Sequence, residues 1–169
     1  MRNGTVLHLR VMILVACMLC GVRGSFGQDH GIGLGVIIGE PTGLSAKVWI
    51  SPVHALDFGL GWSIGSSWVG KPRGHDDRGR RVHYHMDHLW HSFTAIHANQ
   101  RFPLYYGIGA RLNAGAGYDE SIALRGVIGI VWLPVDTVAD FFLEIAPSFV
   151  LLPASAFSLD AGLGVRYFF

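Results

Sequence analysis

The amino-acid sequence predicts an all-β fold: an eight-stranded antiparallel up-and-down β-barrel that spans a membrane. Three observations lead to this prediction. Eight segments alternate apolar residues with small or polar ones, as strands do whose two faces meet different surroundings. Within these segments every Asp, Glu, Lys and Arg falls on the row that is not apolar. The aromatic residues of the apolar rows gather near segment ends, as in the girdles of membrane barrels.

The N-terminal segment has the organisation of a secretory signal. Two arginines accompany an apolar run at 11–22, and small residues occupy the positions that signal peptidase recognises, so we expect cleavage before Gln28. The length of 169 residues then accommodates a signal peptide, 1–27, and one barrel domain, 28–169. With half of its residues hydrophobic and 15% charged, the chain is too apolar to be disordered.

Two alternatives for this segment stay open. An uncleaved anchor is disfavoured because the apolar run is short. Lipidation at Cys17 is the other, because L-V-A-C resembles a lipobox. The only other cysteine, Cys20, also lies in the signal, so we expect a mature chain without disulfides or thiol chemistry. No apolar run of 18 residues follows, and no transmembrane helix is expected.

The first four predicted strands follow in order. Segment 31–39 alternates Ile, Leu and Val with glycine, and E-P-T-G then turns the chain. Segment 44–50 alternates Leu, Ala, Val and Ile with Ser, Lys and Trp. Segment 56–64 follows S-P-V-H and places Leu, Phe, Trp and Ile opposite Asp, Gly and Ser. Segment 82–91 follows a long polar loop, about 66–81, and alternates mostly apolar residues with three histidines and an aspartate.

The last four predicted strands continue the pattern. Segment 104–112 follows a turn near 94–101 and sets Leu, Tyr, Ile and Ala against Gly and Arg. Segment 122–132 sets Ile, Leu and Trp against Ala, Arg, Val and Gly. After L-P-V-D-T, segment 140–151 sets Phe, Leu and Ile against Asp, Glu and Ser. Segment 158–169 sets a wholly apolar row against Ser, Asp, Gly and Arg.

Alternation alone does not decide which row faces inward, and a soluble, lipocalin-like barrel would bury the apolar rows. The other rows hold Gly, Ala and Ser with isolated, nearly balanced charges, which is typical of a confined interior where charges must pair. Strands of about ten residues fit a tilted membrane span. A sheet in lipid must close, and eight strands enclose an interior that side chains can fill.

The inward rows carry a set of titratable residues that we call the lumen network. It consists of Lys47, Asp57, His83, His85, Asp87, His91, Arg111, Arg125, Asp140, Glu144, Asp160 and Arg166. We expect a salt-bridged plug that fixes strand register, with Glu144 pairing across adjacent strands to Arg125 and to Arg166. Glycine-rich rows facing bulky ones fill a small interior. A narrow polar pore is the alternative.

The histidines of H-Y-H-M-D raise the question of a metal. His83, His85 and Asp87 share one strand face, and zinc uses such ligands. Alternate residues of a strand lie roughly 6–7 Å apart, which suits two ligands of one ion. A third ligand must come from another strand, and the sequence indicates none. We therefore expect no metal or other cofactor, and imidazoles that hydrogen-bond to interior carboxylates.

The long polar loop is strongly basic. Its basic residues are Lys71, Arg73, Arg78, Arg80 and Arg81. If the termini face the periplasm, this loop lies outside the cell, where it either meets lipopolysaccharide phosphates or an acidic partner, or is simply solvated. The turns near 51–54, 94–101 and 133–139 are then periplasmic. A nucleic-acid partner is not expected for an external loop.

The last residues, G-V-R-Y-F-F, resemble the end of bacterial outer-membrane β-barrel proteins. The stretches G-E-P-T-G-L-S-A-K, F-G-L-G-W-S and Y-Y-G-I-G-A-R-L add a resemblance to small OmpA/OmpX-type barrels without an assigned activity. The resemblance implies an outer-membrane location and insertion by the barrel-assembly machinery, with Gly164, Tyr167 and Phe169 as its signal. It implies no catalytic residues, and we do not expect the peptidoglycan-binding domain that OmpA carries.

Some eight-stranded outer-membrane barrels are enzymes, and the lipid A deacylases use a His/Ser pair that faces lipid. Here His91 and Ser92 are neighbours and face opposite ways on a strand. His88 shares the outer face with Ser92 but lies roughly 13 Å away. A serine nucleophile needs its base within hydrogen-bond reach, so we expect no enzyme. A lipid-modifying hydrolase remains the third interpretation, after the plugged barrel and the pore.

Overall fold

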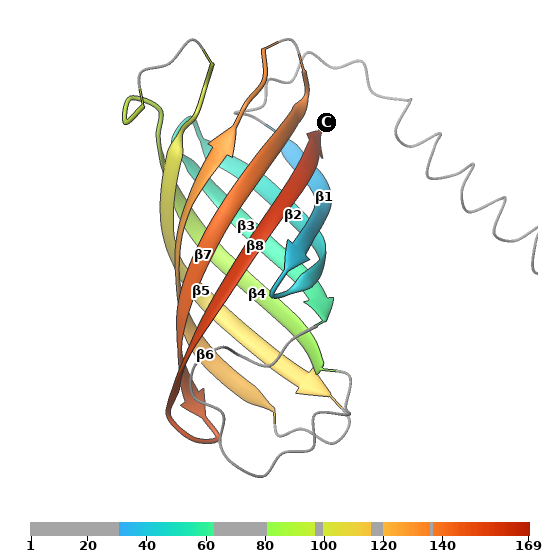
Figure 1. The fold of residues 1–169 in the computed structure, drawn as a ribbon, viewed down its shortest axis with the longest axis vertical. Helices are drawn as coiled ribbons and strands as arrows, with labels where there is room; N and C mark the ends of the chain where they lie inside the picture. The colour runs from blue at the N-terminus through green and yellow to red at the C-terminus, as the bar shows by residue number, and fades with distance from the viewer. Residues whose placement is uncertain (1–30, 63–80, 97–99, 116–119, 136) are drawn as a thin grey trace, which may run out of the picture.

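A computed structural model describes residues 31–62, 81–96, 100–115, 120–135 and 137–169. Eight strands form one closed barrel in which each strand pairs with its sequence neighbours and β1 pairs with β8 (Figure 1). The strands are β1 (Ile32–Gly39), β2 (Thr42–Ser51), β3 (His54–Trp62), β4 (Arg81–Ser92), β5 (Leu104–Gly115), β6 (Ser121–Trp132), β7 (Ala139–Leu152) and β8 (Ala156–Phe168). All pairings are antiparallel, which confirms the predicted fold class.

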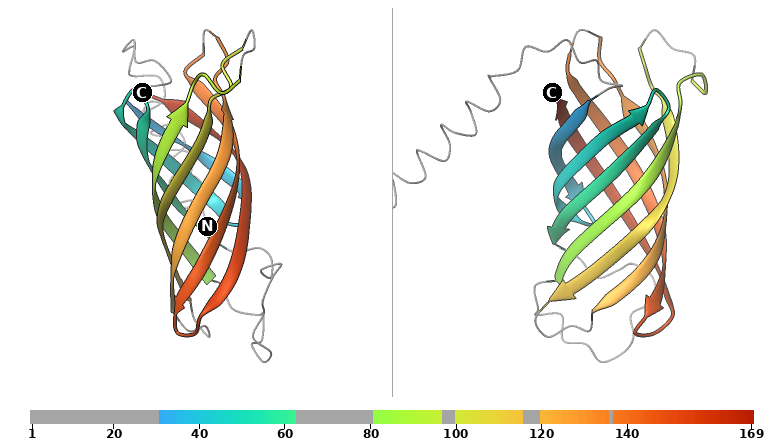
Figure 2. Two further views of the ribbon diagram at one scale, coloured as in Figure 1. Left: turned by 90° about the vertical axis from the view of Figure 1, so that its left-hand side faces the viewer. Right: turned by 180° about the vertical axis from the view of Figure 1, so that it is seen from behind.

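The two ends of the barrel differ. The end that we call the terminal end holds the start of β1, the end of β8 and the connections β2–β3, β4–β5 and β6–β7 (Figures 1 and 2). The opposite end, called the loop end, holds the connections β1–β2 and β7–β8, the ends of β3 and β5, and the starts of β4 and β6. An even number of strands produces this arrangement because each antiparallel strand reverses the chain.

Several strands are longer than the alternation predicts, because backbone pairing continues into residues that we assigned to turns. Thr42 and Gly43 belong to β2, where they pair with Trp62 and Gly61 of β3. Between β2 and β3 only residues 52–53 form the turn. Ladder hydrogen bonds involve the backbone, so a strand ends where its partner ends rather than where side-chain alternation fades.

The barrel closes between the first and last strands. Gly35 of β1 lies opposite Arg166 of β8, and the Phe169 amide donates to the Ile32 carbonyl at 3.0 Å. Closure gives both strands a full set of neighbours and leaves no open sheet edge there. No helix in the described part of the chain is long and apolar enough to cross a membrane.

The β6–β7 ladder lacks two bridges near Pro147. The β6–β7 register runs from Arg125↔Ser148 directly to Ile128↔Ile145, so the intervening residues of the two strands form no bridge. Pro147 lies in this gap opposite Gly126, and proline has no N–H to donate. A Cβ added at Gly126 would meet nothing nearer than Pro147 atoms at 3.8 Å. The interruption is therefore a local consequence of one proline on the outer wall.

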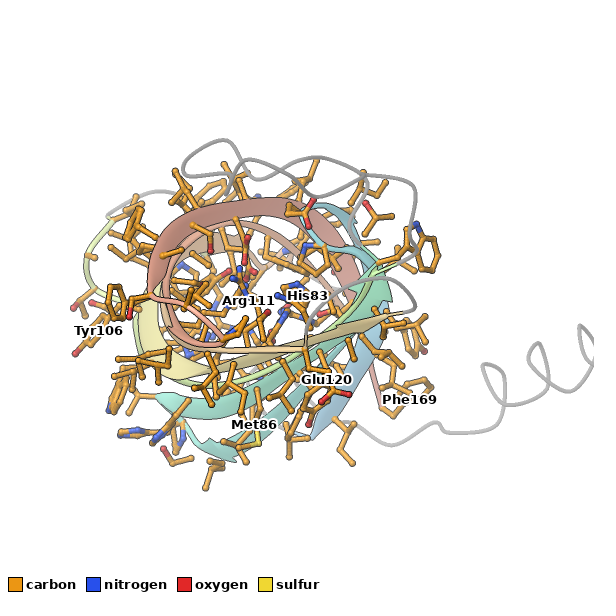
Figure 3. The ribbon with its side chains drawn as sticks, turned by 90° about the horizontal axis from the view of Figure 1, so that it is seen from below. His83, Met86, Tyr106, Arg111, Glu120 and Phe169 are labelled. Carbon is orange, nitrogen blue, oxygen red and sulfur yellow. The ribbon has the colours of Figure 1, made fainter. Side chains whose placement is uncertain are left out.

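Burial is inverted relative to a water-soluble protein. The apolar row of each strand points outward and is exposed: Ile38 is 67% exposed, Ile128 66% and Leu44 62%. The charged row points inward, and Lys47 and Arg125 are completely buried. The structure thus assigns the two rows to the faces that the sequence predicts, with the charged row in the lumen (Figure 3).

Candidate functional site

The barrel lumen brings the lumen network together. All twelve of its residues are buried, and they come from seven strands, β2 to β8. Figure 3 looks into the lumen from the loop end, with His83 and Arg111 pointing inward and Met86 and Tyr106 pointing outward. Side chains from strands that are not neighbours meet here, because an eight-stranded barrel is narrow enough for long side chains to cross.

Arg125 of β6 forms the first centre of the network. Its Nε donates to Asp87 Oδ2 at 3.0 Å, its Nη2 to Glu144 Oε1 at 2.7 Å, and its Nη1 to Asp160 Oδ2 at 3.3 Å. These carboxylates belong to β4, β7 and β8, so one guanidinium ties four strands together. The planar fork of arginine suits several carboxylates at once, whereas a lysine presents a single point charge.

Arg166 of β8 forms the second centre. Its Nη2 donates to Asp57 Oδ1 at 2.6 Å across the lumen, and its Nη1 to Asp140 Oδ2 at 3.4 Å on adjacent β7. Its Nε donates to Ser45 Oγ of β2 at 2.8 Å. The guanidinium carbon also lies 3.7 Å from the Phe142 ring centroid, a close cation–π contact. All three guanidinium nitrogens of Arg166 thus donate hydrogen bonds, and the Phe142 ring packs against the guanidinium.

The remaining cations extend the network toward each end. Arg111 donates to Asp160 Oδ2 at 2.7 Å and to Ser158 Oγ at 2.8 Å. Lys47 Nζ lies 3.6 Å from Asp140 Oδ2, 3.3 Å from His91 Nε2 and over the Tyr105 ring. Every lysine and arginine of the lumen network therefore has a carboxylate within ion-pair distance, as buried charges require.

Of the two pairings expected for Glu144, one forms. Arg125 and Glu144 are joined as predicted, but no ion pair joins Glu144 to Arg166 in the described residues. Glu144 lies opposite Gly162 in the ladder, four residues from Arg166 along β8, and its second oxygen instead accepts from the Tyr105 hydroxyl at 3.1 Å. The expectation was wrong because arginine side chains reach across the lumen as well as along the wall.

Two histidines on the inner face of β4 depart from expectation, since within the described residues neither His85 nor His91 makes a short hydrogen bond to a carboxylate. His83 Nε2 lies 3.0 Å from His85 Nδ1, and His91 Nε2 lies 3.3 Å from Lys47 Nζ. His85 Nε2 is 3.9 Å from Asp57 Oδ2 and 3.9 Å from Asp87 Oδ2, beyond hydrogen-bond reach. The carboxylates are instead engaged by arginines.

Small residues make room for the large ones, as the alternation of small and large rows predicts. A Cβ on Gly59 would overlap the His85 ring, and a Cβ on Gly164 would overlap the Phe142 ring. Gly164, which we assigned to the assembly signal, thus also has a packing role within the lumen. Native-like packing leaves little space in such an interior, so each glycine specifies where a neighbouring ring lies.

The two aromatic residues of the expected assembly signal lie together at the terminal end. Their rings, those of Tyr167 and Phe169, are 5.1 Å apart at an interplanar angle of 69°. On the same end of the outer wall, Trp132 packs against Phe141 at 5.3 Å, and Trp90 stacks on Tyr106 at 5.7 Å. Aromatic rings thus gather around the outer wall at this end.

The outer-face histidine has a partner other than serine. His88 Nε2 lies 3.3 Å from His54 Nδ1, and the His88 ring stacks on Trp90 at 4.4 Å. In the described residues neither His88 nor His91 has a hydrogen-bonded serine. This geometry offers no activated hydroxyl at Ser92.

Some predicted residues lie outside the described residues. These are the signal segment 1–27 with Cys17, and the basic residues Lys71, Arg73, Arg78 and Arg80. Arg81 begins β4, where its backbone pairs with Gly115. Of the five basic residues of the loop, only Arg81 belongs to the described residues, through its backbone at the start of β4.

Several polar residues that the sequence did not single out also act as partners in the lumen. Ser45 and Ser158 accept from arginines, Tyr105 donates to Glu144, and Asn113 Nδ2 donates to Ser121 Oγ at 3.0 Å. Their position on the inward row was the available signal, because they share strand parity with the charges. Their specific partners depend on reach across the barrel, which strand parity does not encode.

Comparisons of the chain with protein-family models, with curated proteins and with solved structures found no match.

Proposed function

We propose that this protein is an integral outer-membrane β-barrel whose lumen network forms a plug, with a structural or surface-binding role. The observation that carries the proposal is the inverted burial: apolar side chains cover the outer wall and charged ones fill the lumen.

The outer wall and the lumen of the barrel favour different surroundings. A continuous apolar outer wall in water would far exceed the few hundred Å² that soluble monomers commonly expose. In hydrocarbon the same wall is favourable, and the charges must then pair inside. Closure of β1 on β8 supports this setting, because an open edge in lipid would leave backbone groups without partners.

Aromatic residues at the barrel ends support a membrane position. The terminal end carries Trp90, Tyr106, Trp132, Phe141 and Tyr167 on the outer wall. Toward the loop end, Trp62, Phe149 and Phe157 are about half exposed on the outer wall. Two bands separated by aliphatic residues are the arrangement expected at two membrane–water interfaces. The pair Tyr167 and Phe169 at the last strand is in keeping with recognition by the barrel-assembly machinery.

The plug favours a closed lumen over the alternative of a narrow pore. Arg125 and Arg166 each reach carboxylates on strands across the barrel, and this places side chains in the path of an ion. Planar-bilayer recordings of the refolded chain should show no stable conductance steps. Stable steps whose size changes on replacing Arg111 or Glu144 with Gln would establish the pore instead.

The surface-binding part of the proposal concerns the basic loop before β4. Replacing Lys71, Arg73, Arg78, Arg80 and Arg81 with Gln should weaken adsorption of the barrel to vesicles containing lipopolysaccharide or anionic lipid. The expected loss is largest at low salt, where exposed charges are least screened. Unchanged adsorption at low salt would leave the loop without a binding role and the barrel with a structural one.

The membrane barrel itself is tested by mobility on SDS gels. The refolded mature chain, 28–169, should migrate faster unboiled than boiled, because a closed barrel without an open sheet edge resists SDS. A soluble, monodisperse protein that requires no detergent and shows no shift would overturn the proposal. It would instead indicate that the outer wall is not a lipid surface.

A further inference from the structure

Three ligand-bearing side chains converge at one point of the lumen. Asp57 of β3, and His85 and Asp87 of β4, offer ligand atoms that all lie within 4.8 Å of one another. Each of these residues is at most 2% exposed. Asp57 and Asp87 are opposite one another in the β3–β4 ladder, and so the third ligand that the sequence did not reveal comes from the adjacent strand.

The separations in this group suit a bridging cation better than hydrogen bonds. His85 Nε2 stands 3.9 Å from one oxygen of each aspartate, which is too far for a hydrogen bond. Zinc–ligand bonds of about 2.0–2.2 Å at a tetrahedral angle place two ligand atoms about 3.4 Å apart, so each oxygen would move about half an ångström toward His85 Nε2. The ligand atoms of the three residues lie within 4.8 Å of one another, so the two carboxylates would also move closer together.

Both carboxylates keep an oxygen that no arginine engages. Arg166 binds Asp57 through Oδ1, which leaves Oδ2 toward His85. Arg125 binds Asp87 through Oδ2, which is also the Asp87 oxygen that lies 3.9 Å from His85 Nε2, so a cation would share this oxygen with Arg125. The buried Oδ1 of Asp87 has no hydrogen-bond partner and lies toward Gly109 of β5, so the carboxylate must rotate to present it to a cation. A buried acceptor without a partner costs free energy, which favours such a rotation.

The neighbouring histidine orients the imidazole of this group. His83 Nε2 lies 3.0 Å from His85 Nδ1, with the rings nearly perpendicular at 87°. When His85 Nδ1–H donates to His83, the lone pair of His85 Nε2 faces the two carboxylates. Metal-binding imidazoles are commonly held this way by a hydrogen bond on the other nitrogen.

The net charge of the lumen network affects how tightly these three residues would bind a cation. The lumen network holds five carboxylates against four lysine and arginine side chains, so it carries one excess negative charge when its histidines are neutral. Binding of a divalent ion would change this net charge to one excess positive charge, and Arg125 and Arg166 would repel the ion. We therefore expect binding weaker than that of structural zinc sites with four protein ligands.

We propose that Asp57, His85 and Asp87 form a binding site for a divalent transition-metal ion of the zinc type inside the lumen, with His83 as its positioning residue. Mixed imidazole and carboxylate ligands suit such ions, whereas magnesium and calcium prefer oxygen alone. This inference goes beyond the proposed function, since it concerns the lumen whether or not the outer wall faces lipid.

The test compares the zinc content of variants at two histidines on the inner face of β4 with that of a parent protein that carries only His88→Gln. The full mature chain is refolded with Zn²⁺, because the site is enclosed, then dialysed and analysed for bound metal by elemental mass spectrometry. All proteins carry His88→Gln, which removes the outer-wall pair of His54 and His88 as a competing site. His85→Gln changes a proposed ligand, and His91→Gln makes the same change on the same inner face outside the site.

The parent and His91→Gln should hold about one zinc per folded chain, and His85→Gln at least tenfold less, because removing a ligand costs affinity of this order or more. A parent without retained zinc, or equal retention by His85→Gln and His91→Gln, would overturn the site. The gel shift on boiling establishes folding of each variant.

A second measurement does not depend on the folding of variants. The parent refolded with Co²⁺ should show visible ligand-field absorption that Zn²⁺ abolishes when it is included in the refolding mixture. No such absorption, in a protein that passes the gel-shift test, would contradict the site independently of the substitutions.

Discussion

At the residue scale, two buried arginines organise the interior. Arg125 and Arg166 together contact carboxylates from β3, β4, β7 and β8. Buried ion pairs contribute little net stability compared with apolar residues of similar shape, but removing one partner leaves unpaired buried charges. Their value to this barrel therefore lies in specifying which strands stand opposite one another, and they become costly only when broken.

The first prediction follows from that asymmetry. Arg125→Met should lower the free energy of unfolding by about 3–5 kcal/mol, because three buried carboxylates lose their shared cation. Denaturant unfolding of the barrel in detergent micelles, followed by tryptophan fluorescence, measures this change.

Arg101→Met is the matched control, because Arg101 is exposed and lies over the Phe93 ring at 5.3 Å. Exposed contacts of this kind contribute about 1 kcal/mol or less. Equal losses in the two variants would mean that the lumen network carries no special energetic weight.

At the element scale, the strands show how pairing and side-chain pattern cooperate. Inward and outward rows hold their parity along β6 and β7 even where the ladder is interrupted at Pro147. Register on both sides of the interruption stays the same, so the proline removes bridges without shifting the strand. Neighbouring pairs, and the continuous pairing of β7 with β8, keep the strand in place.

The second prediction concerns this interruption. Pro147→Val should raise the free energy of unfolding by about 0.5–1.5 kcal/mol, because it supplies the missing backbone donor to β6. The same denaturant experiment measures it, and slower hydrogen exchange at the restored amide would locate the effect.

Phe149→Val is the control, since it places the same side chain on the same face of β7 without adding a donor. It should lower stability through lost apolar contact. A Pro147→Val protein less stable than the parent would mean that the proline conformation, rather than the missing donor, decides stability there.

At the scale of the whole molecule, the decisive property is which solvent the outer wall meets. The wall is apolar on all eight strands, with His54, His88, Gly126 and Pro147 among its few exceptions. If the barrel lies in a bilayer, the free-energy cost of adding a charge to this wall depends on the depth of the charge in the membrane. If the barrel lies in water, that cost is nearly the same at every position.

The third prediction uses that contrast. Ile145→Lys places a charge on the outer wall at the middle of β7 and should cost about 2–4 kcal/mol in lipid vesicles, whereas Trp62→Lys at the end of β3 should cost about 0–1 kcal/mol from the charge. Unfolding of both variants in vesicles measures the difference. Equal small losses would place the outer wall in a polar environment and count against the membrane barrel.

The number of strands, their order and the two faces of each one follow from the amino-acid sequence. These properties are local: alternate side chains point to opposite faces, and turn residues divide the strands. Parity placed each residue of the lumen network, from Lys47 to Arg166, on one face, and the small residues and nearly balanced charges of that face indicated that it is the inner one.

Which inward residues meet depends instead on how the barrel closes. Arg166 reaches Asp57, more than a hundred positions earlier in the chain, and Asp57 joins His85 and Asp87 through the β3–β4 register. These contacts depend on strand stagger, barrel diameter and side-chain length together. The reason is physical: alternation fixes the face of a residue, but the closure of eight strands around a narrow lumen fixes its height and its neighbours across the barrel.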